Sequence, residues 1–295
     1  MDRVAVLGLG LMGSALARAF VAGGRSPVVW NRSPERGEPF ESLDATVAPT
    51  VPDAVRAADV VVVCVQDYGV SSSLLDDPEA IAALAGKSIV QVSSGTPGQA
   101  REASEWAASH GIGYLDGAIM ASPQAIGTEA AMVLYSGLSG TYDRVSELLA
   151  DFGGTGLLVG EDPATAAAID NSLLSMYYAV LLGTLNGAGI CEAFDVPQST
   201  LRDLATALMP TLGDVVVRTL DMVASGDYRS DHSTISTTAG ALGHIAAVTS
   251  EAGVDTGFVA CAQGYAQRAI ELGHLWDGPA SMFEAMRGAS ASSEP

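Results

Sequence analysis

Three glycines near the start of the chain have the spacing that binds a dinucleotide. The segment Gly8-Leu9-Gly10-Leu11-Met12-Gly13 follows an apolar run at 4–7 and precedes apolar residues at helical spacing over 11–21. In a strand, turn and helix, the first glycine permits the turn, the second lets the backbone approach a pyrophosphate, and the third lets the helix pack closely. The helix N-terminus then offers N–H donors to the anion. A dinucleotide site is therefore predicted, with a ligand-free glycine turn as the alternative.

The residues after the second apolar run, 28–30, indicate which dinucleotide binds. Asn31 stands where an NAD enzyme carries an acid that binds the ribose diol and repels a 2′-phosphate. Arg32, Ser33 and Arg36 follow it and offer donors and positive charge. The sequence thus predicts NADPH as the cofactor rather than NADH. Solvent-exposed loop arginines are the alternative explanation.

Other cofactor contacts are assigned where later apolar runs end. Cys64 and Val65 close the run at 59–65, and Ser94 follows the run at 88–92. The complete predicted cofactor site consists of Gly8, Leu9, Gly10, Leu11, Met12, Gly13, Asn31, Arg32, Ser33, Arg36, Cys64, Val65 and Ser94.

The elements that must position these residues alternate between strands and helices in the first half of the chain. Strands are predicted at 4–7, 28–30, 59–65, 88–92, 113–116 and 131–136. Helix-compatible stretches lie between them near 51–58, 78–85 and 97–110. This order is typical of βαβ units, so residues 1–160 are predicted to form an α/β Rossmann domain with a doubly wound sheet.

The second half of the chain has helical patterns alone. They cover 162–194, 199–224, 234–253 and 257–272. We therefore predict an all-α domain over 161–295, joined to the first domain by a long helix that begins at the junction. The small polar residues at 288–295 are predicted to be a disordered tail.

Composition excludes an intrinsically disordered chain and a coiled-coil rod. The chain has 295 residues, of which 48% are hydrophobic and 16% charged, which indicates a globular protein. A net charge of −20 disfavours nucleic acid and anionic lipid as partners. Cys64, Cys191 and Cys261 have neither disulfide-framework nor zinc spacing, and a reducing cytoplasm fits them best.

Neither a metal nor a membrane is predicted as a partner. His110, His232 and His274 lack metal-ligand spacing with carboxylates or cysteines. The apolar stretch 172–191 is long enough to raise a membrane span, but it contains Asn186 and several glycines and has no basic cluster beside it. A buried helix is the preferred interpretation.

Five segments together resemble the imine reductases, including the reductive aminases, within the β-hydroxyacid dehydrogenase superfamily. They are GLGLMG at 8–13, WNRSPER at 30–36, VSSGTP at 92–97, YLDGAIMASP at 114–123 and AAAIDNSLLSMYYAVLLGTLNGAG at 166–189. The resemblance covers nearly the whole chain. It implies NADPH-dependent reduction of C=N bonds in cyclic imines or iminium ions, with reductive amination of a ketone by an amine as a further activity.

At several positions the sequence differs from the hydroxyacid dehydrogenases, and these differences support the resemblance to the imine reductases. Those enzymes have a catalytic lysine in the long helix, whereas the only lysine in this sequence is Lys87, in a predicted turn. Leu174 stands where they carry an asparagine, and Met120 replaces the serine that grips the substrate carboxylate. A thioether suits a hydrophobic substrate better than an acid.

The resemblance also assigns the catalytic residues. Reductive aminases carry an aspartate and, eight residues later, a tyrosine, and Asp170 and Tyr178 have that spacing (178 − 170 = 8). At about 100° per residue both can face one cleft, although Tyr177 lies angularly closer to Asp170, so periodicity alone does not choose between the tyrosines. Asp170 is predicted to bind the amine or iminium, and Tyr178 to orient or protonate the substrate nitrogen. Packing roles for both are the alternative.

The remaining predictions concern the substrate and the assembly. Ser94 replaces an asparagine of the reductive aminases, which weakens the expectation of efficient ketone–amine coupling but not of imine reduction. The resemblance implies a homodimer that exchanges its helical domains. A β-hydroxyacid dehydrogenase and a non-catalytic NADPH-binding protein stay open as alternatives. The predicted substrate pocket consists of Met120, Ala121, Ser122, Leu174, Met209, Leu212 and His244.

Overall fold

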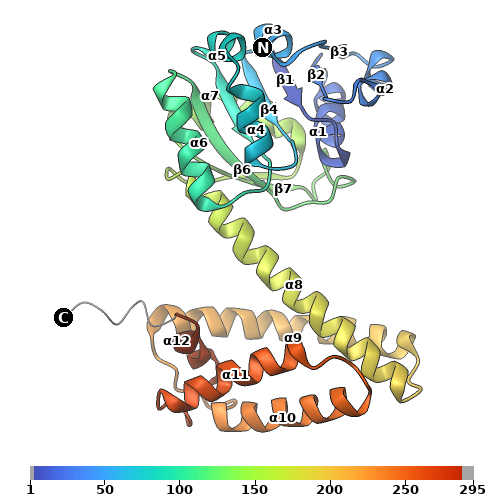
Figure 1. Ribbon diagram of the computed structural model, residues 1–295, viewed down its shortest axis with the longest axis vertical. Helices are drawn as coiled ribbons and strands as arrows, with labels where there is room; N and C mark the ends of the chain where they lie inside the picture. The colour runs from blue at the N-terminus through green and yellow to red at the C-terminus, as the bar shows by residue number, and fades with distance from the viewer. Residues whose placement is uncertain (1–2, 288–295) are drawn as a thin grey trace, which may run out of the picture. The chain divides into compact units, whose positions relative to one another are not determined.

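The computed structural model of the chain describes residues 3–287. The tail predicted to be disordered, 288–295, lies outside the described residues. The chain divides into two compact units, one ending at Ser175 and the other beginning at Met176. The division therefore falls inside a helix, α8, that runs from Ala164 to Ala193 (Figure 1).

The first unit is built on an eight-stranded sheet with the order β3-β2-β1-β4-β5-β6-β7-β8. Neighbouring strands are parallel except β6 and β7, which are antiparallel. The placement of β1 between β2 and β4 is the chain reversal of a doubly wound fold, and ligands bind at such a point. The strands are β1 (Val4–Leu7), β2 (Val28–Trp30), β3 (Thr46–Val47), β4 (Val60–Val63), β5 (Ser88–Gln91), β6 (Gly113–Ile119), β7 (Met132–Ser136) and β8 (Thr155–Gly160).

Helices cover both faces of this sheet (Figure 1). Side chains of one strand alternate between two separate cores: Val4 and Val6 belong to one, whereas Ala5 and Leu7 belong to the other. Burial on both faces explains why the strands read as continuous apolar runs in the sequence. The helices are α1 (Leu11–Ala22), α2 (Glu38–Glu41), α3 (Val51–Ala57), α4 (Tyr68–Leu75), α5 (Pro78–Leu84), α6 (Pro97–Ser109) and α7 (Ser139–Leu149), with short 3₁₀ turns at Pro34–Arg36 and Ala150–Phe152.

The predicted fold class is confirmed, but several elements were not predicted. Two strands, β3 and β8, were missed because β3 has two residues and β8 begins and ends with residues of low apolar character. Helix α4 was missed because serines occupy its centre, and serine competes for backbone hydrogen bonds. The Asp67 side chain compensates by accepting a hydrogen bond from the Val70 N–H at 2.9 Å, which caps α4.

Up to residue 287, the second unit contains helices alone: the rest of α8, then α9 (Gln198–Ser225), α10 (Ile235–Glu251), α11 (Gly257–Glu271) and α12 (Met282–Met286). A 3₁₀ turn at Pro279–Ser281 precedes α12. Helix α9 has no buried residue. The buried apolar side chains that the structure describes in this unit are few and mostly small: Tyr228, Ile235, Val259, Ala266, Ala269 and Ala280.

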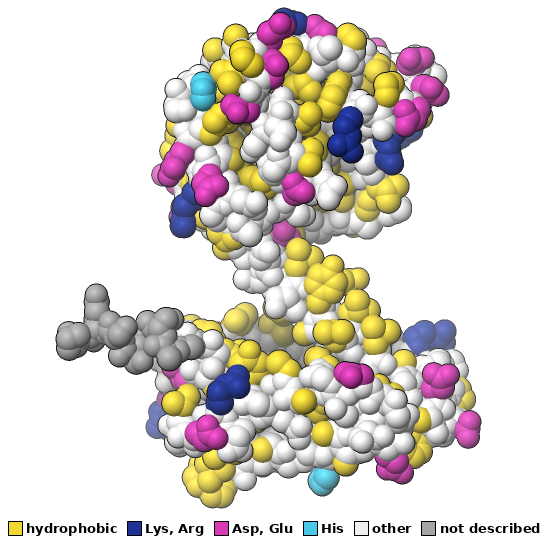
Figure 2. All heavy atoms as spheres, in the orientation of Figure 1, with side chains coloured by type: hydrophobic (Ala, Val, Ile, Leu, Met, Phe, Trp, Pro, Cys, Tyr) yellow, Lys and Arg dark blue, Asp and Glu magenta, His cyan; other side chains and the backbone are white. Residues whose placement is uncertain are grey.

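Helix α8 is apolar yet largely exposed in the single chain. Its buried residues, Ala164, Ala166 and Ala167, all lie at its beginning. Figure 2 shows hydrophobic side chains along the exposed part of the helix. Among residues 3–287, α8 is the one helix whose length and composition would allow a membrane span. The burial predicted for α8 from the sequence is therefore not met within one chain.

Candidate functional site

The glycine-rich loop has the geometry that its spacing predicts. Gly8 has a φ of +100°, and a Cβ atom on it would lie 2.2 Å from the Cys64 carbonyl oxygen. A Cβ atom on Gly13 would lie 2.0 Å from the Gly8 carbonyl oxygen. A Cβ atom on Gly10 would meet nothing within 4 Å. Gly8 and Gly13 are thus required by the protein itself, whereas the space beside Gly10 is open for a ligand.

Asn31 holds the glycine-rich loop in place. Its Oδ1 accepts a hydrogen bond from the Leu9 N–H at 2.9 Å, and its Nδ2 donates to the Ser33 carbonyl oxygen at 3.1 Å. Arg36 Nη1 donates to the Leu9 carbonyl oxygen at 3.3 Å. The end of β2 is therefore tied to the loop between β1 and α1. An asparagine at this position supports the loop without the negative charge of an acid.

A cavity of about 850 Å³ opens beside this loop. Helix α1 begins there at Leu11, and its N-cap, Gly10, makes no side-chain cap hydrogen bond. The free N–H groups of the first helical turn are consequently available to an anion. Residues predicted for the cofactor that line the cavity are Gly8, Gly10, Leu11, Met12, Gly13, Asn31, Arg32, Ser33, Arg36, Cys64 and Val65.

Two predicted cofactor residues lie outside this lining, and one wall was not predicted. Leu9 is buried behind the loop, and Ser94 is exposed after β5. The unpredicted wall is α4, which contributes Val70, Ser73 and Leu74. Its serine-rich sequence carried no helical signal, so only the Asp67 cap could have revealed it.

Two arginines, Arg32 and Arg36, line the cavity. In the described part of the chain, neither Arg32 nor Arg36 forms an ion pair. The arginines that do are Arg3, Arg25, Arg56, Arg101, Arg202, Arg229 and Arg287. Two guanidinium groups without an ion pair, an open helix N-terminus and space beside Gly10 together fit a dinucleotide with an extra phosphate.

Cys64 is a structural part of the cavity wall rather than a reactive thiol. Burial raises the pKa of its thiol to about 11, so the group stays protonated at neutral pH. The next residue, Val65, donates its N–H to Ser93 Oγ at 3.0 Å. This bond joins the ends of β4 and β5 at the edge of the sheet that carries the cavity.

The first turns of α8 are attached to the sheet domain by polar contacts. Asn171 Nδ2 donates to the Gly95 carbonyl oxygen at 2.9 Å and to the Ala167 carbonyl oxygen at 2.8 Å. Asp170, the predicted catalytic acid, is half-buried, and burial raises the pKa of its carboxyl group. Asn171 was not singled out from the sequence, although it adjoins Asp170.

A buried carboxyl group on β6 is the main site feature that the sequence analysis left without a role. Asp116 is buried and accepts a hydrogen bond from the Tyr68 hydroxyl, while the Tyr114 hydroxyl donates to Tyr68 at 3.4 Å. Burial raises the pKa of Asp116 to about 6, and the charge of Asp170 adds to the rise. Hydrogen bonds from Tyr68 and the Ala167 backbone oppose it. A lone charge in an apolar strand was the signal that could have identified Asp116.

The predicted catalytic tyrosine lies on the same continuous helix as Asp170. Tyr178 is 56% exposed and its neighbour Tyr177 is 62% exposed, and their rings meet edge to face with centroids 5.4 Å apart. Helix periodicity places Tyr177 about 20° and Tyr178 about 80° from Asp170 around the axis. That both tyrosines share a side of α8 with the acid stays a prediction from periodicity.

The predicted substrate residues are divided between the two units, and their grouping stays a prediction. Met120 is half-buried against the small core cluster of Ala118, Leu134 and Ala166. Ala121 is half-buried and Ser122 exposed in the turn that follows β6. The remaining four have exposed side chains in the single chain: Leu174 on α8, Met209 and Leu212 on α9, and His244 on α10.

Metal-ligand groupings are absent from the described residues. Nowhere in that part of the chain do three or more His, Cys, Asp or Glu side chains lie close enough together to hold a metal ion.

The fold and the cavity define a class of protein. A doubly wound sheet with a glycine-rich loop at its reversal point is the dinucleotide-binding domain of a dehydrogenase. Residues 3–160 match the family described as the NAD binding domain of 6-phosphogluconate dehydrogenase. Residues 162–288 match the NADPH-dependent reductive aminase-like C-terminal domain.

Comparison with individual proteins narrows the class to a family. An imine reductase from Myxococcus stipitatus, solved in complex with NADP⁺, is 35% identical, and the alignment covers 96% of this chain and 99% of that one with a TM-score of 0.92. A reductive aminase from Aspergillus terreus, solved with NADPH and ethyl levulinate, is 29% identical over 97% and 100% of the chains, with a TM-score of 0.90. An NADPH-dependent reductive aminase from Aspergillus oryzae is 28% identical over 95% of this chain and 96% of its own length. The chain belongs to the imine reductase and reductive aminase family, which confirms the resemblance found in the sequence.

Proposed function

We propose that this chain catalyses the NADPH-dependent reduction of C=N bonds in cyclic imines and iminium ions to amines. One observation carries the proposal. The alignment with an imine reductase that was solved with NADP⁺ covers 99% of that enzyme's chain. The cavity beside the glycine-rich loop supports it, because its lining offers donors and positive charge. The protein is thus an oxidoreductase acting on C=N bonds.

The cofactor assignment follows from the residues of that cavity. The free N–H groups at the start of α1 would bind the pyrophosphate, and Arg32, Ser33 and Arg36 would bind the 2′-phosphate. When bound, NADPH supplies the hydride for the reduction. Ser94 and Leu9, which do not line the cavity, would act at its edge and behind its loop.

Asp170 and Tyr178 carry the remaining chemistry in this proposal. The carboxylate of Asp170 binds the cationic nitrogen of an iminium ion or holds the amine that forms. The hydroxyl of Tyr178 orients or protonates the substrate nitrogen, and Tyr177 is the alternative donor. Met120 and the exposed apolar residues of α8 and α9 would surround the apolar part of the substrate.

Reductive amination is a second candidate activity. A reductive aminase from Aspergillus terreus has been solved with cyclohexanone and allyl amine, and it is 30% identical to this chain with a TM-score of 0.89. Ser94 in place of the asparagine of that subgroup favours a preformed imine over a ketone and an amine as substrates. Turnover assays distinguish both activities from that of a β-hydroxyacid dehydrogenase. They also distinguish a catalyst from a non-catalytic NADPH-binding protein.

A homodimer with exchanged helical domains completes the proposed site. Support comes from the exposed apolar side chains of α8 and α9 and from the few buried side chains of the second unit. In such a dimer the helices of one chain would form the substrate wall for the other. The free state of the three cysteines agrees with a cytoplasmic enzyme.

The first experiment measures NADPH oxidation with methylpyrroline and with a six-membered cyclic imine. Parallel reactions use NADH, and NADP⁺ with hydroxyisobutyrate. Imine-dependent oxidation that prefers NADPH is expected. Turnover of the hydroxyacid without turnover of imines would assign the dehydrogenase activity instead, and cofactor binding without any turnover would favour a non-catalytic protein.

The proposed catalytic roles are tested by Asp170→Asn and Tyr178→Phe. Each substitution should lower kcat for the imine by at least about tenfold, because it removes a charge or a proton donor at the reacting nitrogen. Affinity for NADPH, measured by fluorescence titration, should stay unchanged. Tyr177→Phe tests the alternative donor: a loss of turnover in that variant with near-native turnover in Tyr178→Phe would move the donor role to Tyr177. Near-native turnover in both Asp170→Asn and Tyr178→Phe would reject the assignment.

A further inference from the structure

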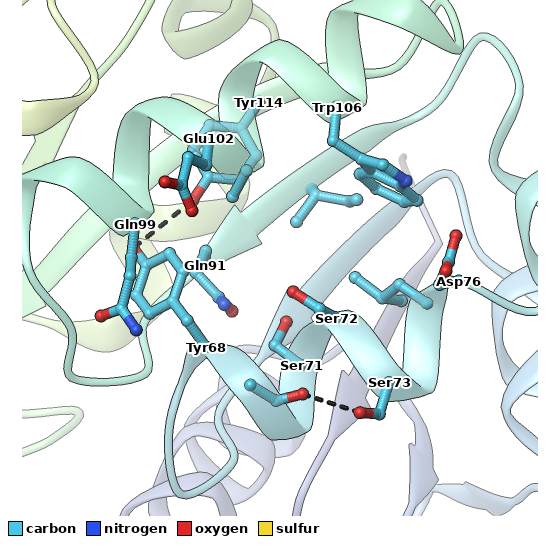
Figure 3. Close-up of a pocket in the computed structure, with 14 residues that line it drawn as sticks. Tyr68, Ser71, Ser72, Ser73, Asp76, Gln91, Gln99, Glu102, Trp106 and Tyr114 are labelled. Carbon is cyan, nitrogen blue, oxygen red and sulfur yellow. Dashed lines mark hydrogen bonds between the residues drawn. The ribbon is translucent and has the colours of Figure 1, made fainter.

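A second cavity, of about 430 Å³, lies in the first unit between α4 and α6 (Figure 3). It differs from the cofactor cavity, although Gly69 and Ser73 of α4 line both. Val70 and Leu74 face the cofactor cavity, whereas Ser71, Ser72 and Leu75, which are rotated around the helix axis, face the second one. Helix α4 is therefore a wall between two cavities, and the function proposed above uses one of them.

A buried amide oxygen in the second cavity lacks a hydrogen-bond partner among the described residues. Gln91, at the end of β5, lines the cavity and is only 2% exposed. Within the described residues, its Oε1 accepts no hydrogen bond. Burial of an amide without its hydrogen bonds is unfavourable, so native proteins pair such groups with protein, water or ligand. A ligand that carries an N–H donor would supply the missing partner.

The charges around this cavity are all of one sign. Asp76 at the end of α4 and Glu102 on α6 line it, and none of the described lining residues is basic. Tyr68 and Tyr114 also line the cavity, and their hydroxyl groups connect it to the carboxyl group of Asp116. An anionic ligand would be repelled here, whereas a cation would be attracted.

The rest of the lining suits an apolar body. Trp106 and Tyr114 contribute aromatic rings, while Ile89, Leu75 and Ala103 contribute aliphatic surface (Figure 3). Aromatic faces bind both hydrocarbon groups and ammonium ions. The serine hydroxyls of α4 add polar contacts at the edge. The lining thus combines an apolar interior, a buried hydrogen-bond acceptor and an acidic rim.

We propose that this cavity binds a small primary ammonium ion with a compact hydrocarbon group. The ammonium N–H groups would donate to Gln91 Oε1 and face the rim carboxylates, and the hydrocarbon would contact Trp106 and Tyr114. The site is separate from the reaction site and does not depend on the proposed catalysis. Its ligand class nevertheless includes amines that the proposed reaction would release.

The test titrates the NADP⁺-saturated protein with three probes of one shape: cyclohexylmethylammonium, cyclohexylmethanol and cyclohexanecarboxylate. Calorimetry gives the affinities, and tryptophan fluorescence reports on Trp106. The ammonium ion should bind at least about tenfold more tightly than the alcohol, and the carboxylate most weakly. Trp106→Phe should abolish the fluorescence change. Equal binding of the alcohol and the ammonium ion would reject the proposal.

Variants assign the binding to this cavity. Ala103→Phe should fill it and weaken ammonium binding by at least about tenfold. Asp76→Asn combined with Glu102→Gln, both at exposed positions, should weaken it about three- to tenfold without affecting folding. Glu105→Gln, on the same helix but outside the lining, is the matched control.

Asp170→Asn separates this site from the proposed reaction site. Binding detected by Trp106 should persist in that variant, whereas loss of the signal would place the ammonium ion at the reaction site and reject the proposal. Affinity that is unchanged in both the filled and the rim-neutralised variants would also reject it. Failure of the proposed catalysis would appear as absent imine turnover in the unmodified protein, independently of these titrations.

Discussion

At the scale of single residues, we propose that Arg32 and Arg36, which line the cofactor cavity, determine which dinucleotide binds. We expect Arg32→Ala and Arg36→Ala to raise KM for NADPH by about tenfold or more, because each removes a charge-assisted hydrogen bond to the 2′-phosphate. KM for NADH should change little. Steady-state kinetics with both cofactors measures the effect, with Arg202→Ala, an exposed arginine of α9, as control. Parallel rises for both cofactors would contradict the assignment.

Asp116 is a second residue whose chemistry gives a measurable prediction. Its pKa of about 6 lies above the ordinary value of 3.8, so the folded protein holds this proton more tightly than the unfolded chain does. The contribution of Asp116 to stability therefore falls as pH rises from about 4 through about 6. Asp116→Asn removes the charge and keeps an oxygen that can accept from Tyr68.

Unfolding by urea at two pH values tests this prediction. Relative to the unmodified protein, the free energy of unfolding of Asp116→Asn should rise by about 1 kcal/mol between about pH 5 and about pH 8. Glu105→Gln, at an exposed position of α6, should show no such change. An equal difference at both pH values would mean that Asp116 does not titrate as described.

At the scale of elements, the junction of β1 and α1 contains one glycine that packing requires, Gly13, and one that we propose binds the cofactor, Gly10. Gly13→Ala would place a Cβ atom 2.0 Å from the Gly8 carbonyl oxygen, so the helix must move from the strand and stability should fall by several kcal/mol, about the cost of overpacking a core. Gly10→Ala meets open space in the protein and should fold normally. Its methyl group would instead obstruct the pyrophosphate.

Thermal unfolding and NADPH titration distinguish these two variants. Gly10→Ala should keep the melting temperature of the unmodified protein and bind NADPH at least about tenfold more weakly. Gly13→Ala should lose melting temperature whether or not cofactor is present. Tight binding of NADPH by a stable Gly10→Ala variant would show that the pyrophosphate does not approach this loop.

At the scale of the whole molecule, we expect the exposed apolar surface of α8 to pack against a second copy of the chain. Leu185 is 58% exposed in the single chain, and exposed patches of this kind mark interfaces. We expect a dimer in light scattering without detergent, and Leu185→Asp should dissociate it or prevent its folding. Ala108→Asp, at an exposed position of α6, should leave the dimer intact. A monomeric unmodified chain would contradict the proposed assembly.

Local patterns allowed a large part of this structure to be predicted from the sequence. Valine-rich runs buried on both faces identified β1, β2, β4 and β5, and the glycine spacing identified the loop at Gly8 to Gly13. The order of segments also identified the family. These features can be recognised locally, because glycine turns, apolar strand runs and helical periodicity each involve only a short segment of the sequence.

Other features were decided only by the tertiary structure. The sequence predicts Asn31 as a donor to the 2′-phosphate, but its contact with the Leu9 N–H joins the segments that follow β1 and β2. Helix α4 has a weak helical sequence, and its role as a wall between two cavities depends on the sheet and on α6. Asp116 and Gln91 acquire their properties from burial, since desolvation raises the pKa of one and leaves the other without a partner. Burial and long-range contacts depend on the whole fold, and no local pattern encodes them.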